Sequence, residues 1–256
     1  MARQDPATTQ LKSVRTTFKI VEFLKRETAG SVSEISAHLE LPKSTVHSHL
    51  ATLNQLGYLV NDDGTYRLGY RFVHLGRTIE QSHELRQIVS PTIETLAEET
   101  GEQAYFAVEE NGLATNVAVA EGENSIRRRF LPGGQARMTS TATGKAILAH
   151  LSPERVDEIV RRWGMPPEAP NTITDEDELY TELESIRTAG IAYGRGESIK
   201  GVLEIAMPIL GDDGRPHGAV EIAGPIKRLD DEAYRETLVD EIETAVNEIE
   251  VNLSLR

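Results

Sequence analysis

The chain has 256 residues, no cysteine and a formal net charge of −14 at pH 7. This length suffices for one large or two ordinary domains, each with its own hydrophobic core. The absence of cysteine excludes a disulfide framework and a thiolate metal site. No charged segment precedes an apolar run, and no apolar stretch approaches the roughly 18 residues of a membrane span. We therefore expect a cytoplasmic protein that has no membrane partner.

The negative charge is unevenly distributed along the chain. Residues 1–77 carry ten Lys or Arg and seven Asp or Glu, whereas the remaining residues are strongly acidic. The basic excess near the N-terminus is compatible with a nucleic-acid partner for that part of the chain. Seven of the basic residues are Lys and twenty are Arg. An acidic, arginine-rich composition of this kind is typical of a salt-adapted, halophilic protein.

Two helices are predicted near the N-terminus. The first spans residues 13–26 and is followed by Gly30 as a stop signal. The residues expected on its buried face are Val14, Phe18, Val21 and Leu24. Ser31 and Glu34 have the spacing of a capping box, which predicts that a second, short helix begins there. Both helices supply a core for the segment that follows.

The segment LPKSTVHSHLATLNQLGYL, residues 41–59, predicts a third helix. Pro42 suits a first helical turn, and Gly57 is a stop signal. Val46, Leu50 and Leu53 recur at helical spacing and form a buried stripe. The opposite arc and its flanks hold small or polar side chains that could enter a major groove, among them Ser44, Thr45, His47, Ser48 and Gln55.

A hairpin should follow this helix. Two β-rich stretches, residues 58–60 and 65–68, flank Asp63 and Gly64, a favoured hairpin turn. Residues 1–69 thus have the pattern of a winged helix-turn-helix, a DNA-binding domain. We expect the polar arc of the third helix to face base edges and phosphates, and Lys43 and Arg67 to hold the DNA backbone.

The rest of the chain predicts a linker helix and a second domain. Residues 70–86 alternate apolar and charged side chains at helical spacing, so we expect a linker helix whose apolar edge is buried in a partner. Another helix is predicted over residues 88–100. Residues 87–256 then combine hairpins with helices, an α+β pattern in which helices cover at least one side of a sheet. Strands are predicted at 105–108, 115–119, 202–210 and 218–223, and helices at 141–151, 154–163, 174–188 and 230–253.

Two glutamates stand out in the predicted strands. Period-two alternation places Glu204 and Glu221 on strand faces that otherwise carry small residues, opposite the apolar faces. One interpretation is a solvated outer face, or ion pairs with Arg127–Arg129, Arg137 or Arg195. The other is a ligand pocket, because burying an unpaired carboxylate destabilises the fold unless a ligand binds to it. Such a pocket would favour hydroxyl groups or a cation over a simple anion.

No catalytic or metal site is predicted, and no cofactor is implied. The pair Gly144-Lys145 lacks the other residues of a phosphate-binding loop. An enzyme would have to rely on Thr143, Lys145 and the two glutamates, which have no recognisable activating neighbour. The histidines show no ligand spacing, because His47 and His49 point in nearly opposite directions from one helix. A metal-responsive repressor stays an alternative, since paired carboxylates can bind divalent ions.

Three stretches in this order resemble the IclR-type transcriptional regulators across nearly the whole chain. They are LPKSTVHSHLATLNQLGYL, STATGKAILAHL, and GESIKGVLEIAMPIL with GAVEIAGP. The resemblance implies an N-terminal winged helix-turn-helix joined by a linker helix to a GAF-like α/β effector-binding domain. It also implies homodimers, often paired into tetramers, that repress or activate transcription from palindromic operator DNA in response to a small-molecule effector.

The resemblance further implies where an effector lies. In that family the site is formed by the segments that match Thr141–Lys145, Val202–Glu204 and Glu221–Ala223. The candidate effector-binding residues are therefore Thr141, Ala142, Thr143, Val202, Glu204, Glu221 and Ala223, with Arg137 available for an acid group. Members that bind small carboxylic acids tend to have neutral side chains at the two glutamate positions. We therefore expect a polyhydroxylated, sugar-derived metabolite that donates hydrogen bonds to these carboxylates.

Overall fold

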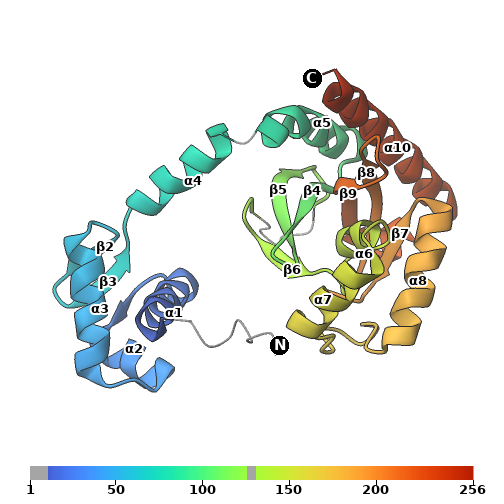
Figure 1. Ribbon diagram of the computed structural model, residues 1–256. Helices are drawn as coiled ribbons and strands as arrows, with labels where there is room; N and C mark the ends of the chain where they lie inside the picture. Colours follow the sequence, from blue (N-terminus) through green and yellow to red (C-terminus); the bar gives the residue numbers. More distant parts are fainter. Residues whose placement is uncertain (1–10, 83, 126–130, 256) are drawn as a thin grey trace. The chain divides into compact units, whose positions relative to one another are not determined.

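The computed structural model describes residues 11–82, 84–125 and 131–255. The chain divides into two compact units, residues 1–82 and residues 83–256 (Figure 1). Each unit has its own hydrophobic core. Arg127–Arg129, which the sequence offers as ion-pair partners for the strand glutamates, lie outside the described residues.

Before the linker helix, the described residues of the first unit form three helices and a small sheet. The helices are α1 (Lys12–Glu27), α2 (Val32–Leu39) and α3 (Lys43–Gln55), and the strands are β1 (Gly30–Ser31), β2 (Leu59–Asp62) and β3 (Thr65–Leu68). The strands are antiparallel in the order β1-β3-β2. At the wing turn, Asp63 and Gly64 have φ values of 49° and 89°, the left-handed pair that a tight hairpin turn requires. The predicted hairpin is confirmed, whereas β1 was not predicted.

The helix boundaries follow the expected signals. Ser31 caps α2, because its Oγ accepts from Glu34 N at 3.3 Å while Glu34 Oε2 accepts from Ser31 N at 2.7 Å. The predicted capping box is thus confirmed. Pro42 is the residue immediately before α3, and Gly57 follows its C-terminal end with φ 77°. These signals mark the start of α2 and both ends of α3.

The predicted buried face of α1 was partly wrong. Val21 and Leu24 are buried, but Val14 and Phe18 are 49% and 60% exposed. The buried face also includes Ile20 and Phe23, so its centre is rotated around the helix, away from residues 14 and 18. Those two side chains lie on its outer flank because α2, α3 and the wing occupy only the other side.

The linker helix α4 (Arg71–Ser82) extends from the wing. Its first turn is held by Phe72, whose ring centroid lies 5.1 Å from that of Tyr58, and by Arg71, whose Nη1 donates to Leu56 O at 2.7 Å. No residue of α4 is buried, and large apolar side chains such as Val73 and Ile79 are at least half exposed. The predicted exposed apolar edge is confirmed.

The second unit is built on a six-stranded antiparallel sheet. Its elements are α5 (Glu84–Thr100), β4 (Gln103–Glu110), β5 (Leu113–Glu121), β6 (Gln135–Arg137), α6 (Ala142–Leu148), α7 (Pro153–Trp163), α8 (Glu176–Ala189), β7 (Ala192–Arg195), β8 (Val202–Leu210), β9 (Pro216–Pro225), α9 (Ile226–Leu229) and α10 (Glu232–Ser254). The strand order is β6-β5-β4-β9-β8-β7, so the predicted α+β architecture is confirmed. The edge strands β6 and β7 were missed because three or four residues are too few to show a period of two.

Helices cover both faces of this sheet (Figure 1). On one face, α5 and α10 pack against the apolar side chains of β8 and β9, such as Leu203, Ile205 and Ile222. On the other face, α6, α7 and α8 form a second cluster with small residues that include Ala206 and Ala219. The sheet face with small residues therefore lies under α6, and this positions the candidate site.

Helix α5 begins at Glu84, earlier than predicted, and contains Pro91 in its interior. A proline there removes one helical hydrogen bond and costs about 3 kcal/mol. Five residues of α5 are buried, and this packing against the sheet and α10 offsets that cost. Among the described residues, no helix has the length and apolar composition needed to cross a bilayer.

Candidate functional site

Helix α3 separates a buried stripe from an exposed polar surface. Val46, Leu50 and Leu53 are buried in the core of the first unit, as the spacing predicts. The candidate DNA-contacting residues lie on the other side or on the wing: Lys43, Ser44, His47, Ser48, Gln55 and Arg67 are exposed, and Thr45 is half-buried. A polar helix surface carried on a rigid core is the arrangement that enters a major groove.

Two of these polar side chains have internal partners. Ser48 Oγ donates to Ser44 O at 2.9 Å, and Arg67 Nε lies 3.2 Å from Asp62 Oδ2 across the wing. His49, in contrast, faces inward, since its Nδ1 lies 2.8 Å from Thr17 Oγ1 of α1. The two histidines of α3 thus point in different directions, as their spacing predicts: His47 is exposed and His49 is half-buried.

The strand register brings Glu204 and Glu221 to adjacent rows of one sheet face. Glu204 pairs with Ala223, and Ala206 pairs with Glu221. Each glutamate is only 5% exposed, so the interpretation as a solvated outer face was wrong. Gly194 lies beside Glu204 on β7, where a Cβ would be 2.4 Å from Glu204 Oε2. Glycine at that position leaves room for the carboxylate.

Both carboxylates accept hydrogen bonds from the first turn of α6. Ala142 N donates to Glu204 Oε2 and Thr143 N donates to Glu221 Oε2, each at 3.0 Å. The Thr143 hydroxyl also donates to Glu221 Oε2, and the Ser198 hydroxyl donates to the other oxygen of Glu204. The next N–H of α6 donates to the side chain of Thr141, which caps the helix. The free N–H groups of the helix start are thereby occupied from within the chain.

Burial controls the protonation of this pair. Loss of hydration raises the pKa of Glu204 to about 7, although the hydrogen bonds from Ser198 and Ala142 oppose the rise. Burial, and after it the neighbouring charge of Glu204, raises the pKa of Glu221 well above its usual value. Near neutral pH the site therefore holds less than two full negative charges.

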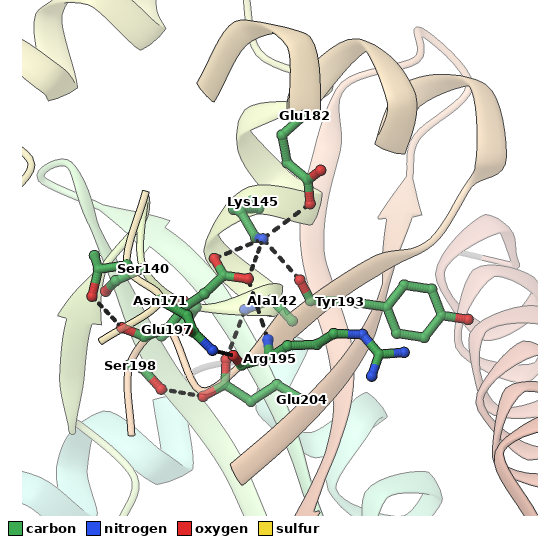
Figure 2. Close-up of polar contacts among 12 residues, drawn as sticks. Ser140, Ala142, Lys145, Asn171, Glu182, Tyr193, Arg195, Glu197, Ser198 and Glu204 are labelled. Atoms are coloured by element: carbon green, nitrogen blue, oxygen red, sulfur yellow. Dashed lines mark hydrogen bonds and ion pairs between the residues drawn. The ribbon is translucent and has the colours of Figure 1, made fainter. Parts of the chain in front are cut away.

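A buried lysine of α6 lies near this pair (Figure 2) and interacts electrostatically with Glu204. Lys145 is fully buried, and its Nζ lies 2.8 Å from Glu197 Oε2, 3.0 Å from Glu182 Oε1 and 2.8 Å from Tyr193 O. These three acceptors satisfy the ammonium group, as a buried charge requires. The lysine links α6 to α8, to β7 and to the segment between β7 and β8.

Arg137 and Arg195 do not neutralise the strand glutamates. Arg137 Nη1 lies 2.9 Å from Glu168 Oε1, and Arg195 Nη1 lies 2.7 Å from Asp230 Oδ1. The proposed ion pairs between these arginines and the two glutamates were therefore wrong.

Val202 and Ala223 are buried beside the two carboxylates. Together with Tyr105 they form a small apolar cluster on the sheet, separate from the two main cores. The register places Tyr105 next to Glu221. The site thus combines two carboxyl groups with an apolar patch.

Sequence reasoning missed the roles of Glu197 and Ser198, which contact Lys145 and Glu204. The stretch GESIKG was noted only as part of a motif, and it carries no periodic signal of its own. Thr143 and Lys145, the candidates for an enzyme, are engaged in the contacts described above. Among the described residues, no group of three or more His, Cys, Asp or Glu side chains is arranged to hold a metal ion.

The architecture defines a class of protein. A winged helix-turn-helix with an exposed polar helix, joined to an α+β unit with a buried polar site, is typical of ligand-responsive transcriptional regulators. Family models agree, since residues 13–63 match the IclR helix-turn-helix domain and residues 78–251 match the bacterial transcriptional regulator IclR C-terminal domain. The chain belongs to the IclR family of transcriptional regulators.

Individual relatives cover nearly the whole chain. The probable HTH-type transcriptional regulator ArcR of Halobacterium salinarum is 29% identical over 248 residues, 95% of this chain and 94% of that protein. The transcriptional repressor IclR of Escherichia coli is 30% identical over 237 residues, 90% of this chain and 86% of that protein. An IclR homolog from Microbacterium hydrocarbonoxydans, crystallised with 4-hydroxybenzoate, has a TM-score of 0.78 at 23% identity, covering 96% of this chain and all of that chain.

Proposed function

We propose that this protein acts in the cytoplasm as a non-enzymatic regulator that binds palindromic operator DNA and responds to a small metabolite. The observation that carries the proposal is the exposed polar surface of α3 beside a well-formed wing. Ser44, Thr45, His47, Ser48 and Gln55 would contact base edges and phosphates. Lys43 and Arg67 would hold the backbone on either side.

We further propose a homodimer, with a tetramer as a dimer of dimers. Large apolar side chains that are at least half exposed include Tyr70 directly before the linker helix, Val73 and Ile79 on it, and Phe18 on α1. An edge of this kind is stabilised when a second copy covers it. A dimer places two α3 helices on the DNA, and their separation sets the spacing of the half-sites.

The effector site proposed here is the sheet face beneath α6. Thr141, Ala142 and Thr143 would border it on the helix side, and Val202, Glu204, Glu221 and Ala223 on the sheet side. Within the described part of the chain, no group donates a hydrogen bond to Oε1 of Glu221. A ligand hydroxyl could fill this vacancy in the hydrogen-bond pattern. The carboxylates already accept from the helix N–H groups, and this disfavours a ligand carboxylate at the same place.

These features support a polyhydroxylated, sugar-derived effector. Its hydroxyl groups would donate to the two carboxyl groups, and the apolar patch around Val202 would cover its carbon skeleton. Arg137 would take an acid group at the far end, in competition with Glu168. The crystallised relative with bound 4-hydroxybenzoate supports small-molecule binding in this family. Differential binding to two conformations would couple the site to the DNA-binding unit by about 1–3 kcal/mol.

The first test is operator binding by fluorescence anisotropy, with the promoter of the protein's own gene in molar KCl. Lys43→Ala should weaken binding to all sequences and lower the slope of log affinity against log salt by about 1. His47→Ala should instead relax sequence preference. Lys25→Ala is the matched control, since it removes an exposed charge of α1 that is paired with Glu22. No specific binding under any condition would overturn the proposed function.

The effector is tested by adding sugar acids, aromatic acids and divalent metals to the bound operator. Glu204→Gln and Glu221→Gln should each abolish the response and leave operator affinity unchanged, since neither lies in the DNA-binding unit. A normal response from both variants would place the effector elsewhere. A response to divalent metals alone would identify a metal-responsive repressor of the same fold.

A further inference from the structure

The two glutamates of the proposed effector site are closed off from solvent. Glu204 and Glu221 are each 5% exposed, so little of either carboxyl group is open to a ligand in this conformation. Strands β8 and β9 lie inside the sheet, and all residues of α6 are buried. The neighbouring element with a free surface is residues 195–201, the last residue of β7 and its connection to β8, in which Arg195, Lys200 and Gly201 are exposed. We call this segment the strap.

The strap touches Glu204 directly. The Ser198 hydroxyl donates to one oxygen of Glu204, whose other oxygen accepts from Ala142 N of α6 (Figure 2). Glu204 is therefore held between the strap and the helix. A movement of the strap would remove one of its two partners and uncover the carboxylate.

Side chains from outside hold the strap in place. Thr172 Oγ1 donates to Glu197 O at 2.6 Å, and Asn171 Nδ2 donates to Arg195 O at 2.7 Å. A buried ion pair between Lys145 and Glu197 also holds the strap, and removing one partner of such a pair is costly. Gly196 and Gly201 flank the central residues with φ values of 70° and 83°. Both ends thus have backbone conformations that glycine adopts readily.

Lys145 has one acceptor on the strap and two elsewhere. Glu197 is 8% exposed and belongs to the strap, whereas Glu182 belongs to α8 and its side chain is 34% exposed. Both glutamates lie about equally close to the ammonium group, at 2.8 and 3.0 Å. Loss of either charge leaves the lysine with one carboxylate, but only the loss of Glu197 frees the strap.

We propose that Lys145 is a positioning residue that holds the strap closed over Glu204 through Glu197, and that the strap opens about Gly196 and Gly201 to admit the effector. The purpose assigned to this opening rests on the proposed function. The opening itself is a property of the second unit and can be measured without a ligand or DNA.

The test compares Glu197→Gln with Glu182→Gln in the full-length protein. Carbodiimide and glycinamide label accessible carboxyl groups, and mass spectrometry then measures the rate at Glu204. Hydrogen exchange measures the strap itself, where Gly196 N donates to Val202 O. Glu197→Gln should raise both rates by about tenfold or more, because it favours local opening. Glu182→Gln should leave both rates near those of the unaltered protein.

Equal rates in the two variants, or no change in either, would overturn the proposal. Ser198→Ala provides a second variant if Glu197→Gln fails to fold. This substitution removes only the hydrogen bond between the strap and Glu204, so the labelling rate of Glu204 should rise while the circular dichroism spectrum stays unchanged. Labelling of Glu204 at the original rate would contradict the proposal that the strap covers it. Operator anisotropy with sugar acids tests the effector separately. A mobile strap without any response to sugar acids would refute the proposed sugar-derived effector and leave the strap opening intact.

Discussion

Replacing Glu204 with Gln should change how the stability of the second unit depends on pH. Burial raises the pKa of Glu204 from 4.5 to about 7 in the folded chain. The folded state therefore binds a proton more tightly than the unfolded state. This contribution to stability is fully present below about pH 4.5, declines as the pH rises toward 7, and is lost above that. Gln keeps an acceptor for Ala142 N but cannot ionise.

The size of the effect follows from the shift. One pKa unit corresponds to 1.36 kcal/mol, so the change from 4.5 to about 7 amounts to about 3 kcal/mol over the whole range. Between about pH 5 and about pH 8, the difference in the free energy of unfolding between the two proteins should change by roughly 2 to 3 kcal/mol. Burial raises the pKa of Glu221, and the charge of Glu204 adds to this rise. The substitution removes that added contribution, which acts in the same direction. The variant should thus gain stability relative to the original protein as the pH increases.

Urea unfolding at constant ionic strength measures this difference. Trp163, the only tryptophan of the chain, lies at the end of α7 in the second unit, and its fluorescence reports on that unit. The free energy of unfolding of both proteins is determined from about pH 5 to about pH 8. Comparing the two proteins cancels the titration of distant groups. A stability difference that stays constant across this range would show that Glu204 is not protonated in the folded state, and would refute the reasoning.

Two further substitutions test packing and capping. Gly194→Ala should lower the free energy of unfolding by about 1–3 kcal/mol, because its Cβ would lie 2.4 Å from Glu204 Oε2. The control Gly76→Ala lies in a helix with open space around it, so it should be neutral or stabilising. Equal urea midpoints for the two variants would contradict the clash. Ser31→Ala should cost about 1 kcal/mol through loss of the N-cap. Ser33 is exposed in the same helix, so Ser33→Ala should leave the stability measured by thermal circular dichroism unchanged. An equal loss of stability in both variants would refute the capping argument.

The alternation in β8 and β9 was predictable from sequence. Strand β8 has the predicted bounds, 202–210, and its apolar residues Leu203, Ile205 and Ile209 face the core under α5 and α10. Period two fixes these directions, since any one-residue shift would expose the apolar set. The same pattern predicted that Glu204 and Glu221 share the opposite face. It did not predict whether that face meets water, an arginine or a helix.

The contacts of Lys145 show why the other contacts of the site could not be predicted from the sequence. Its partners Glu182 and Glu197 are 37 and 52 residues away in sequence, and no periodicity relates positions so far apart. The lysine was considered only as part of a phosphate-binding loop or an enzyme. The short strand β7 and the strap bring these residues together, and neither has a periodic pattern. The same reason explains why Arg137 proved to pair with Glu168.

The sequence by itself determined the longer helices and strands, the DNA-binding architecture and the buried stripe of α3, because each depends on local periodicity, caps and turn residues. The tertiary structure alone decided where the two strand glutamates point and what they bind. The α6 helix starts directly above them, so its N–H groups meet their carboxylates. Burial then raises their pKa values. Hydration and long-range contacts are properties of the packed sheet and helices, and a single strand does not contain them.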